Sequence, residues 1–127
     1  MPYLLDTNIF LEIFLNQEKK EKAKDFIGTN FNQLFASDFS IHSVGIILIK
    51  QKKFKIFEEF LDEITSYITI LSLPQEKYSD LNKISKKYNL DFDDSYQTIL
   101  AKEFDLTIFT MDDDFTKVKS FITVKFL

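Results

Sequence analysis

The sequence predicts an α/β protein, a three-layer α/β/α sandwich around a mostly parallel sheet of about five strands. Short apolar runs alternate with longer amphipathic segments along the 127 residues, which is the pattern of β-α-β units. Right-handed connections between parallel strands place helices on both faces of such a sheet. The chain contains only two glycines and two prolines, and no linker or repeat interrupts the pattern. We therefore expect a single domain over residues 1–127.

The first strand and two helices are expected within the first 28 residues. Tyr3–Leu5 is a short apolar run, and Asp6–Asn8 after it supplies residue types that cap a helix N-terminus. The apolar segment Ile9–Leu15 then suits a largely buried helix. Glu18–Ile27 predicts a lysine-rich amphipathic helix that ends near Gly28, a residue type common just beyond helix ends.

A second strand and two further helices follow. Leu34–Ala36 predicts the strand, and Ser37–Asp38 is suited to cap a helix that runs to about Lys50. Large apolar residues then recur at helical spacing and predict the next helix. They are Phe54, Phe57, Phe60, Leu61 and Ile64.

The second half of the chain predicts three more strands. Ile68–Leu73 is strand-like, and Pro74 after it is suited to the first turn of a helix that ends at Tyr88–Asn89. Another helix begins at Asp91 or Phe92, with Tyr96, Ile99 and Leu100 facing inward. The last two strands are Leu106–Thr110 and Ile122–Phe126.

Composition excludes several classes of function. Cysteine is absent, so there is no disulfide framework, zinc–thiolate site or thiol nucleophile. All 16 basic residues are lysines, which excludes an arginine clamp. No apolar run is long enough for a membrane span, and the N-terminus lacks a basic signal region. We expect a cytoplasmic protein with no membrane partner.

Acidic residues are concentrated in one stretch. The net charge is −4, and residues 91–114 contain eight of the 20 acidic residues but only one lysine. Asp6 follows the first strand and Asp112 follows another, so both carboxylates leave the same edge if these strands are parallel neighbours. Each acid taken alone also suits a cap or a turn. Together they would repel one another unless they are protonated or bind a cation.

This carboxylate set predicts a site for a hard divalent ion. Oxygen ligands without cysteine or a nearby histidine select Mg²⁺ or Mn²⁺. Such an ion can activate water for attack on a phosphodiester. We therefore interpret the chain as a nuclease.

Three motifs resemble those of the PIN domain, the fold of VapC-type toxin ribonucleases. They are Leu5-Asp6-Thr7-Asn8-Ile9, Asp94-Ser95-Tyr96-Gln97 and Thr110-Met111-Asp112-Asp113-Asp114-Phe115. The resemblance covers nearly the whole chain. It implies that Asp6, Asp94 and Asp112 are catalytic and bind the metal ion. It also implies that Asn8 and Thr110 are polar neighbours of the ion, and that Asp114 is structural.

The sequence departs from the family pattern in the helix after the second strand. The pattern has a glutamate about two turns into this helix, where Gly45 stands here. Since glycine destabilises a helix interior, we expect something to approach the backbone there. His42 and Ser43 are alternative site residues. Asp91 and Asp93 are alternative sources of the missing charge.

The resemblance implies an RNA substrate, an antitoxin partner and a homodimer. Two lysine clusters, Lys19–Lys24 and Lys50–Lys55, suit either a solvated surface or an RNA-contacting rim. The main hypothesis is a Mg²⁺- or Mn²⁺-dependent ribonuclease that acts as a toxin. The alternative is a catalytically weakened PIN-like module that binds RNA or a protein partner. An aspartyl-phosphate phosphatase or receiver-like domain ranks last, since a haloacid-dehalogenase-type phosphatase needs an aspartate where Asn8 stands.

Overall fold

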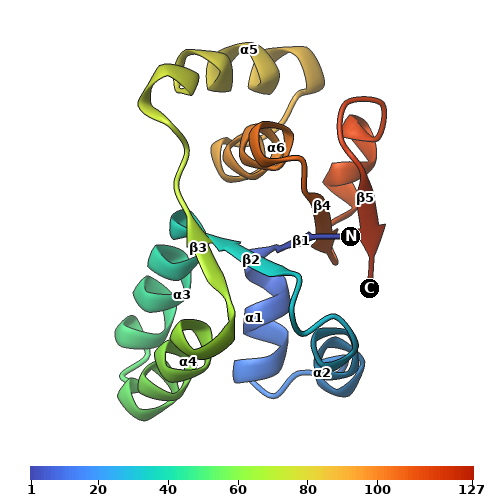
Figure 1. Cartoon of the computed structure of the whole chain (residues 1–127). Coiled ribbons are helices and arrows are strands. Elements are labelled where there is room, and N and C mark those ends of the chain that lie inside the picture. Colours follow the sequence, from blue (N-terminus) through green and yellow to red (C-terminus); the bar gives the residue numbers. More distant parts are fainter.

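A computed structural model describes all residues 1–127 and contains one five-stranded sheet in which every pair of neighbouring strands is parallel. The strand order is β3-β2-β1-β4-β5 (Figure 1). The predicted α/β class with about five strands is confirmed. The strands are β1 (Tyr3–Leu5), β2 (Leu34–Ser37), β3 (Thr69–Leu71), β4 (Thr107–Thr110) and β5 (Val124–Phe126).

Helices cover both faces of the sheet, as the right-handed connections require. Figure 1 shows α1 to α4 below the sheet and α5 and α6 above it. The lower helices are α1 (Thr7–Phe14), α2 (Lys20–Thr29), α3 (Asp38–Lys50) and α4 (Phe54–Tyr67). The upper ones are α5 (Ser79–Tyr88) and α6 (Phe92–Phe104), and two 3₁₀ helices are η1 (Gln75–Lys77) and η2 (Asp113–Val118).

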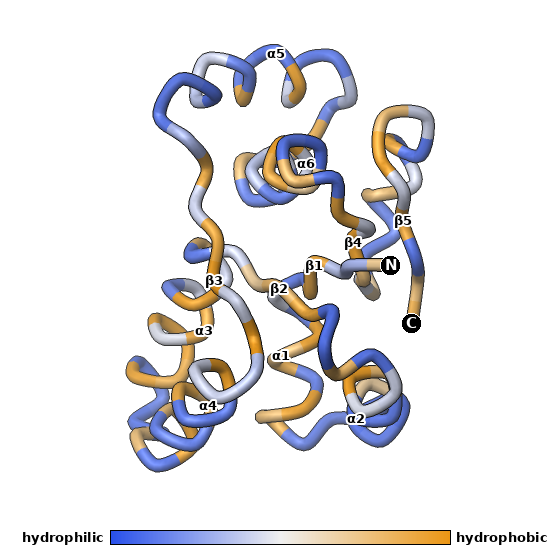
Figure 2. Tube along the Cα trace, viewed as in Figure 1, coloured by the Kyte–Doolittle hydropathy of each residue, from blue (hydrophilic) through white to orange (hydrophobic).

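Successive strand residues point into two separate cores, because side chains alternate along a strand. Leu4 and Ile108 pack with α5, α6 and η2, whereas Leu5 and Phe109 pack with the lower helices. Phe60 of α4 is fully buried in the lower core. In Figure 2 the apolar residues of α5 face α6, and its outer side is hydrophilic. The sheet is therefore held from both sides by independent apolar layers.

Several element boundaries differ from the prediction. Helix α2 runs from Lys20 to Thr29, so Gly28 lies inside it, and Asn30 forms the cap by donating its side-chain amide to the Phe26 carbonyl at 2.9 Å. Pro74 precedes the 3₁₀ turn η1 rather than opening α5. No helix is both long and apolar enough to cross a membrane.

Candidate metal centre

The strand order changes direction at β1, since β2 and β3 lie on one side of it and β4 and β5 on the other. In open α/β sheets, ligands bind beyond the carboxyl ends of the strands at such a point. Leu5 pairs with Phe109, and the Asp6 N–H donates to the Phe109 carbonyl at 3.0 Å. Asp6 after β1 and Asp112 after β4 therefore leave the same edge of the sheet.

A carboxylate cluster lies at this edge. Asp94, Asp112 and Asp114 each contribute one oxygen, and these oxygens lie within 4.8 Å of one another. Asp94 is buried at the first turn of α6, Asp112 is half-buried and Asp114 is exposed. The Asp114 N–H donates to Asp112 Oδ1 at 2.9 Å. Asp114, given only a structural role by its motif, thus belongs to the cluster as well.

Asp6 lies beside this cluster, and its carboxylate is 6% exposed. It caps α1 by accepting the Thr7 N–H at 2.9 Å, and it also accepts the Thr110 hydroxyl at 2.7 Å and the Gln97 amide at 3.3 Å. Burial raises the pKa of Asp6, these hydrogen bonds lower it, and the Asp112 charge raises it. Asp6 therefore both caps α1 and lies at the candidate metal centre.

Asp94 has the most perturbed environment in the cluster. Its carboxylate accepts no hydrogen bond from the protein, and its pKa is raised from 3.8 to about 7, with burial as the largest cause. The nearby charges of Asp93, Asp112, Asp6 and Asp114 act in the same direction. A carboxylate without donors or a cationic partner stays protonated or binds a cation.

No lysine pairs with Asp6, Asp94 or Asp112; the cluster's single ion pair joins Asp114 to Lys117 at 3.4 Å. An uncompensated set of carboxylate oxygens matches the ligands of Mg²⁺ and Mn²⁺. The residues present therefore fit a hard divalent ion.

A buried polar network stands behind Asp6, and sequence reasoning missed it. The Gln97 amide donates to Ser40 Oγ at 2.9 Å, and Ser40 Oγ lies 2.8 Å from the Thr7 hydroxyl. These contacts join α6, α3 and α1. One signal existed, because Gln97 follows Asp94 by three residues and so shares its helix face.

Asn8 and Thr110 hold the loop after β4. Asn8 Oδ1 accepts the Met111 N–H at 3.3 Å, and the Thr110 hydroxyl accepts the Asp112 N–H at 2.9 Å. Both lie beside the carboxylates, where the motifs had placed them. Thr110 thereby connects Asp6 with the start of the Asp112 turn.

On α3, the expected close approach at Gly45 is confirmed, whereas His42 lies away from the site. Ser40 faces the network, and a helix turns about 100° per residue, so His42 lies on the opposite side, where it is exposed and makes no hydrogen bond. A Cβ on Gly45 would lie 3.1 Å from the Phe57 ring of α4. The glycine thus allows α3 and α4 to pack closely and does not face the carboxylates. Ser43 is half-buried on the Ser40 side of α3.

The two alternative acids of α6 differ in their relation to Asp94. Asp91 is the exposed N-cap residue of α6, and its side chain makes no capping hydrogen bond. Asp93 is exposed too, but its charge raises the pKa of Asp94. Asp93 therefore adds negative charge beside the cluster.

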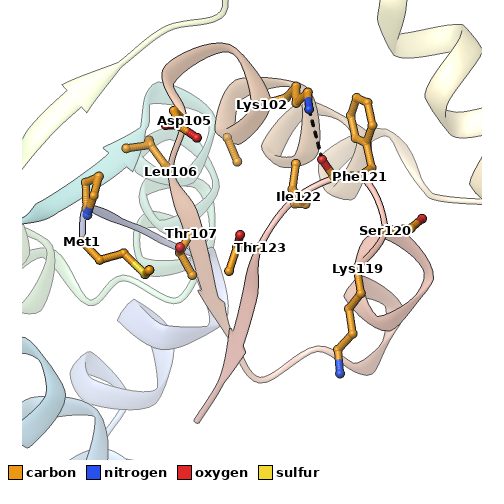
Figure 3. Close-up of a pocket in the computed structure, with 12 residues that line it drawn as sticks. Met1, Lys102, Asp105, Leu106, Thr107, Lys119, Ser120, Phe121, Ile122 and Thr123 are labelled. Carbon is orange, nitrogen blue, oxygen red and sulfur yellow. Dashed lines mark hydrogen bonds between the residues drawn. The ribbon is translucent and has the colours of Figure 1, made fainter.

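A hollow of about 640 Å³, drawn in Figure 3, is lined by none of these acids. It is lined by residues at the N-terminal ends of the strands, including Met1, Leu106 and Thr107, and by the loop before β5. Lys102 points toward Phe121 there and donates to its carbonyl at 3.4 Å. This hollow belongs to the opposite end of the sheet from the carboxylates.

The family model described as the PIN domain matches residues 3–120. No curated protein sequence matches the chain significantly. The fold is similar to a toxin–antitoxin complex from Klebsiella pneumoniae, with 19% identity, a TM-score of 0.78, and 97% of this chain and 95% of that chain covered.

Two further solved structures share the fold. One is VapBC2 from Rickettsia felis bound to a DNA fragment from its promoter, with 16% identity, a TM-score of 0.81, and coverage of 99% and 98%. The other is FitAcB from Neisseria gonorrhoeae, with 17% identity, a TM-score of 0.69, and coverage of 96% and 95%.

Proposed function

This chain belongs to the PIN domain family, and on that premise we propose that it is a metal-dependent ribonuclease, the toxin of a toxin–antitoxin pair. PIN domains are generally nucleases. The observation that carries the proposal is the cluster of Asp94, Asp112 and Asp114 beside Asp6, a set of four acids of which only Asp114 has a cationic partner.

Asp6, Asp94 and Asp112 are the proposed ligands of Mg²⁺ or Mn²⁺, with Asp114 as a further oxygen donor. The bound ion supplies charge for the phosphoryl oxygens and lowers the pKa of a water molecule. Asp6 is oriented by Thr7, Gln97 and Thr110. Its Oδ1 accepts two hydrogen bonds and its Oδ2 accepts one, so Oδ2 keeps a lone pair for a ligand.

The metal site is tested by calorimetric titration of Mn²⁺ into the wild type and the Asp94→Asn and Asp112→Asn variants. Both substitutions are expected to weaken binding at least tenfold, because each removes a charged ligand from the set. Asp105→Asn is the matched control, since Asp105 is exposed at the far end of α6 in a left-handed conformation that asparagine also adopts. Equal affinity in all four proteins would refute the site.

Ribonuclease activity is tested on structured and single-stranded RNA with Mg²⁺ or Mn²⁺. We expect cleavage by the wild type and by Asp105→Asn, and none by Asp6→Asn. The second candidate function, a weakened module that binds RNA or protein, is favoured by the absence of a glutamate on the site side of α3. Absence of cleavage together with retained RNA binding in Asp6→Asn would favour that candidate.

We also propose a protein antitoxin as partner and a cytoplasmic location. A hollow of about 450 Å³ between α1, α2 and α4 offers apolar walls from Phe14, Ile27 and Phe31, the last 50% exposed. Apolar side chains of a partner would bury this surface. The proposed homodimer has a different candidate face, where Ile46, Ile49 and Phe54 are exposed. The molar mass of the purified chain in solution, measured alone and with the antitoxin, tests the homodimer and the antitoxin complex.

A further inference from the structure

A separate hollow of about 370 Å³ lies between α5 and the first turns of α6. Its lining comes from α5, from α6 and from the residue just before α5, and contains no charged residue. The lining residues are Tyr78, Leu81, Asn82, Ser85, Phe92 and Ser95. The Ser95 hydroxyl is fully buried and has no hydrogen-bond partner. Buried polar groups are rarely left unpaired, so this hydroxyl is available to a ligand that enters the hollow.

Two aromatic side chains border the hollow and remain open to solvent. Phe92 is 57% exposed and Tyr78 is 50% exposed. Both rest on the buried ring of Tyr96, with ring centroids 6.4 Å and 6.2 Å away. Tyr96 is itself fixed, because its hydroxyl donates to Asp38 at 2.7 Å and accepts the Leu73 N–H at 2.9 Å. The exposed rings therefore stand on a rigid base.

The hollow adjoins the metal centre through α6. Phe92 and Ser95 are three residues apart and line the hollow, whereas Asp94 faces the other acids. One helical turn thus presents a neutral aromatic surface on one side and carboxylates on the next. Because Asp94 lies between Phe92 and Ser95 in the sequence, the hollow and the carboxylates lie within one helical turn of each other.

We infer that this hollow binds one unpaired nucleobase of the RNA, next to the phosphodiester held at the carboxylates. The inference rests on the proposed function and adds to it a binding site for one base. Exposed aromatic rings are stacking platforms for unpaired bases. Ser95 and the Asn82 amide offer hydrogen bonds to a base edge, and a phosphate is disfavoured because no lysine lines the hollow.

The test measures binding separately from cleavage. Fluorescence anisotropy with Ca²⁺, a hard ion that also takes oxygen ligands, in place of Mg²⁺ or Mn²⁺ follows single-stranded uridine and adenosine RNAs of about 12 nucleotides. Phe92→Ala and Tyr78→Ala are each expected to weaken binding about tenfold, and Phe92→Tyr to restore it. Phe104→Ala is the matched control, because Phe104 is 40% exposed on the far end of the same helix. Ser95→Ala is expected to reduce the difference between the two RNAs.

Two further measurements distinguish base stacking from attraction to the phosphate backbone. Polyphosphate, a polyanion without bases, is expected to bind all variants equally. RNA that contains 4-thiouridine is expected to cross-link to Phe92 or Tyr78 on irradiation. Because Phe92, Tyr78 and Phe104 are exposed, unchanged thermal unfolding is expected to show that their variants fold; the buried Ser95→Ala variant is checked in the same way.

The outcomes separate this inference from the proposed function. Metal-dependent cleavage with unchanged RNA affinity in Phe92→Ala and Tyr78→Ala would overturn the inference and leave the function standing. The reverse result, aromatic-dependent binding without any cleavage, would support the nucleobase site and overturn the nuclease. Cross-links confined to other elements would also overturn the nucleobase site. So would substitutions that weaken binding of the proposed antitoxin and leave RNA binding unchanged.

Discussion

The strongest prediction concerns the stability of the metal-free protein as the pH changes. The pKa of Asp94 is raised from 3.8 to about 7, so the folded state holds a proton that the unfolded state has released. The contribution of Asp94 to the free energy of unfolding is therefore fully present below pH 4 and is lost as the pH rises to about 7. Asp6, whose pKa is also raised, acts in the same direction.

The magnitude follows from the shift. About three pKa units correspond to ~4 kcal/mol over the whole range, of which roughly 2–3 kcal/mol falls between pH 5 and pH 8. Asp94→Asn removes the titrating group and keeps the shape of the side chain. Relative to the wild type, the variant is expected to gain about 2–3 kcal/mol of unfolding free energy between pH 5 and pH 8.

The assay is urea unfolding of both proteins in EDTA at the two pH values, with Asp105→Asn as the control for a generic loss of negative charge. Because the comparison is between a variant and the wild type, the titrating groups that do not interact with Asp94 cancel. Saturating Mn²⁺ at pH 8 is expected to stabilise the wild type more than Asp94→Asn. The reasoning is refuted if Asp94→Asn and the wild type lose the same free energy between pH 5 and pH 8.

Three further predictions concern the residues around the carboxylates and the core. Thr110→Val removes the donor to Asp6, and we expect a loss of about 1–3 kcal/mol at pH 8 by urea unfolding, with Thr107→Val in the same strand as control. Ser43→Glu adds a carboxylate on the site side of α3 and is expected to tighten Mn²⁺ binding in calorimetry, whereas Gly45→Glu, whose side chain meets Phe57, is not. Tighter binding by Gly45→Glu than by Ser43→Glu would contradict the assigned helix faces. Phe60→Ala is expected to cost about 3–5 kcal/mol by urea unfolding, and a cost below 1 kcal/mol would contradict its full burial.

Local patterns were sufficient for most of the fold. The β-α-β alternation, the cap residues Ser37 and Asp6, and the end of α5 at the left-handed Asn89 depend on contacts within a few residues, and these features appear where expected. The boundaries that shifted, at Gly28 and Pro74, depend on how a helix end packs. A glycine near a helix end has no preference strong enough to end the helix by itself.

The candidate metal centre, like the fold, could be predicted from the sequence only in part. From the sequence, Asp6 and Asp112 could be assigned to one edge only on the condition that their strands are parallel neighbours, and Asp94 joined them through its motif. The parallel pairing of β1 with β4 meets that condition. The positions of Gln97, Ser40 and Asp114 relative to them could not be predicted. A hydrogen bond such as that from Gln97 to Asp6 joins residues 91 positions apart, and its formation depends on side-chain distances that only the packed helices define.

The amino-acid sequence by itself determined the α/β class, the acidic edge and the absence of thiol and arginine chemistry, since these follow from residue types and their periodic spacing. Only the tertiary structure decided that Gly45 accommodates Phe57, that His42 faces solvent, and that Phe92 and Tyr78 stand exposed beside an unpaired Ser95 hydroxyl. The physical reason is that the periodicity of the sequence determines on which face of a helix a residue lies, whereas its burial depends on which neighbouring element covers that face.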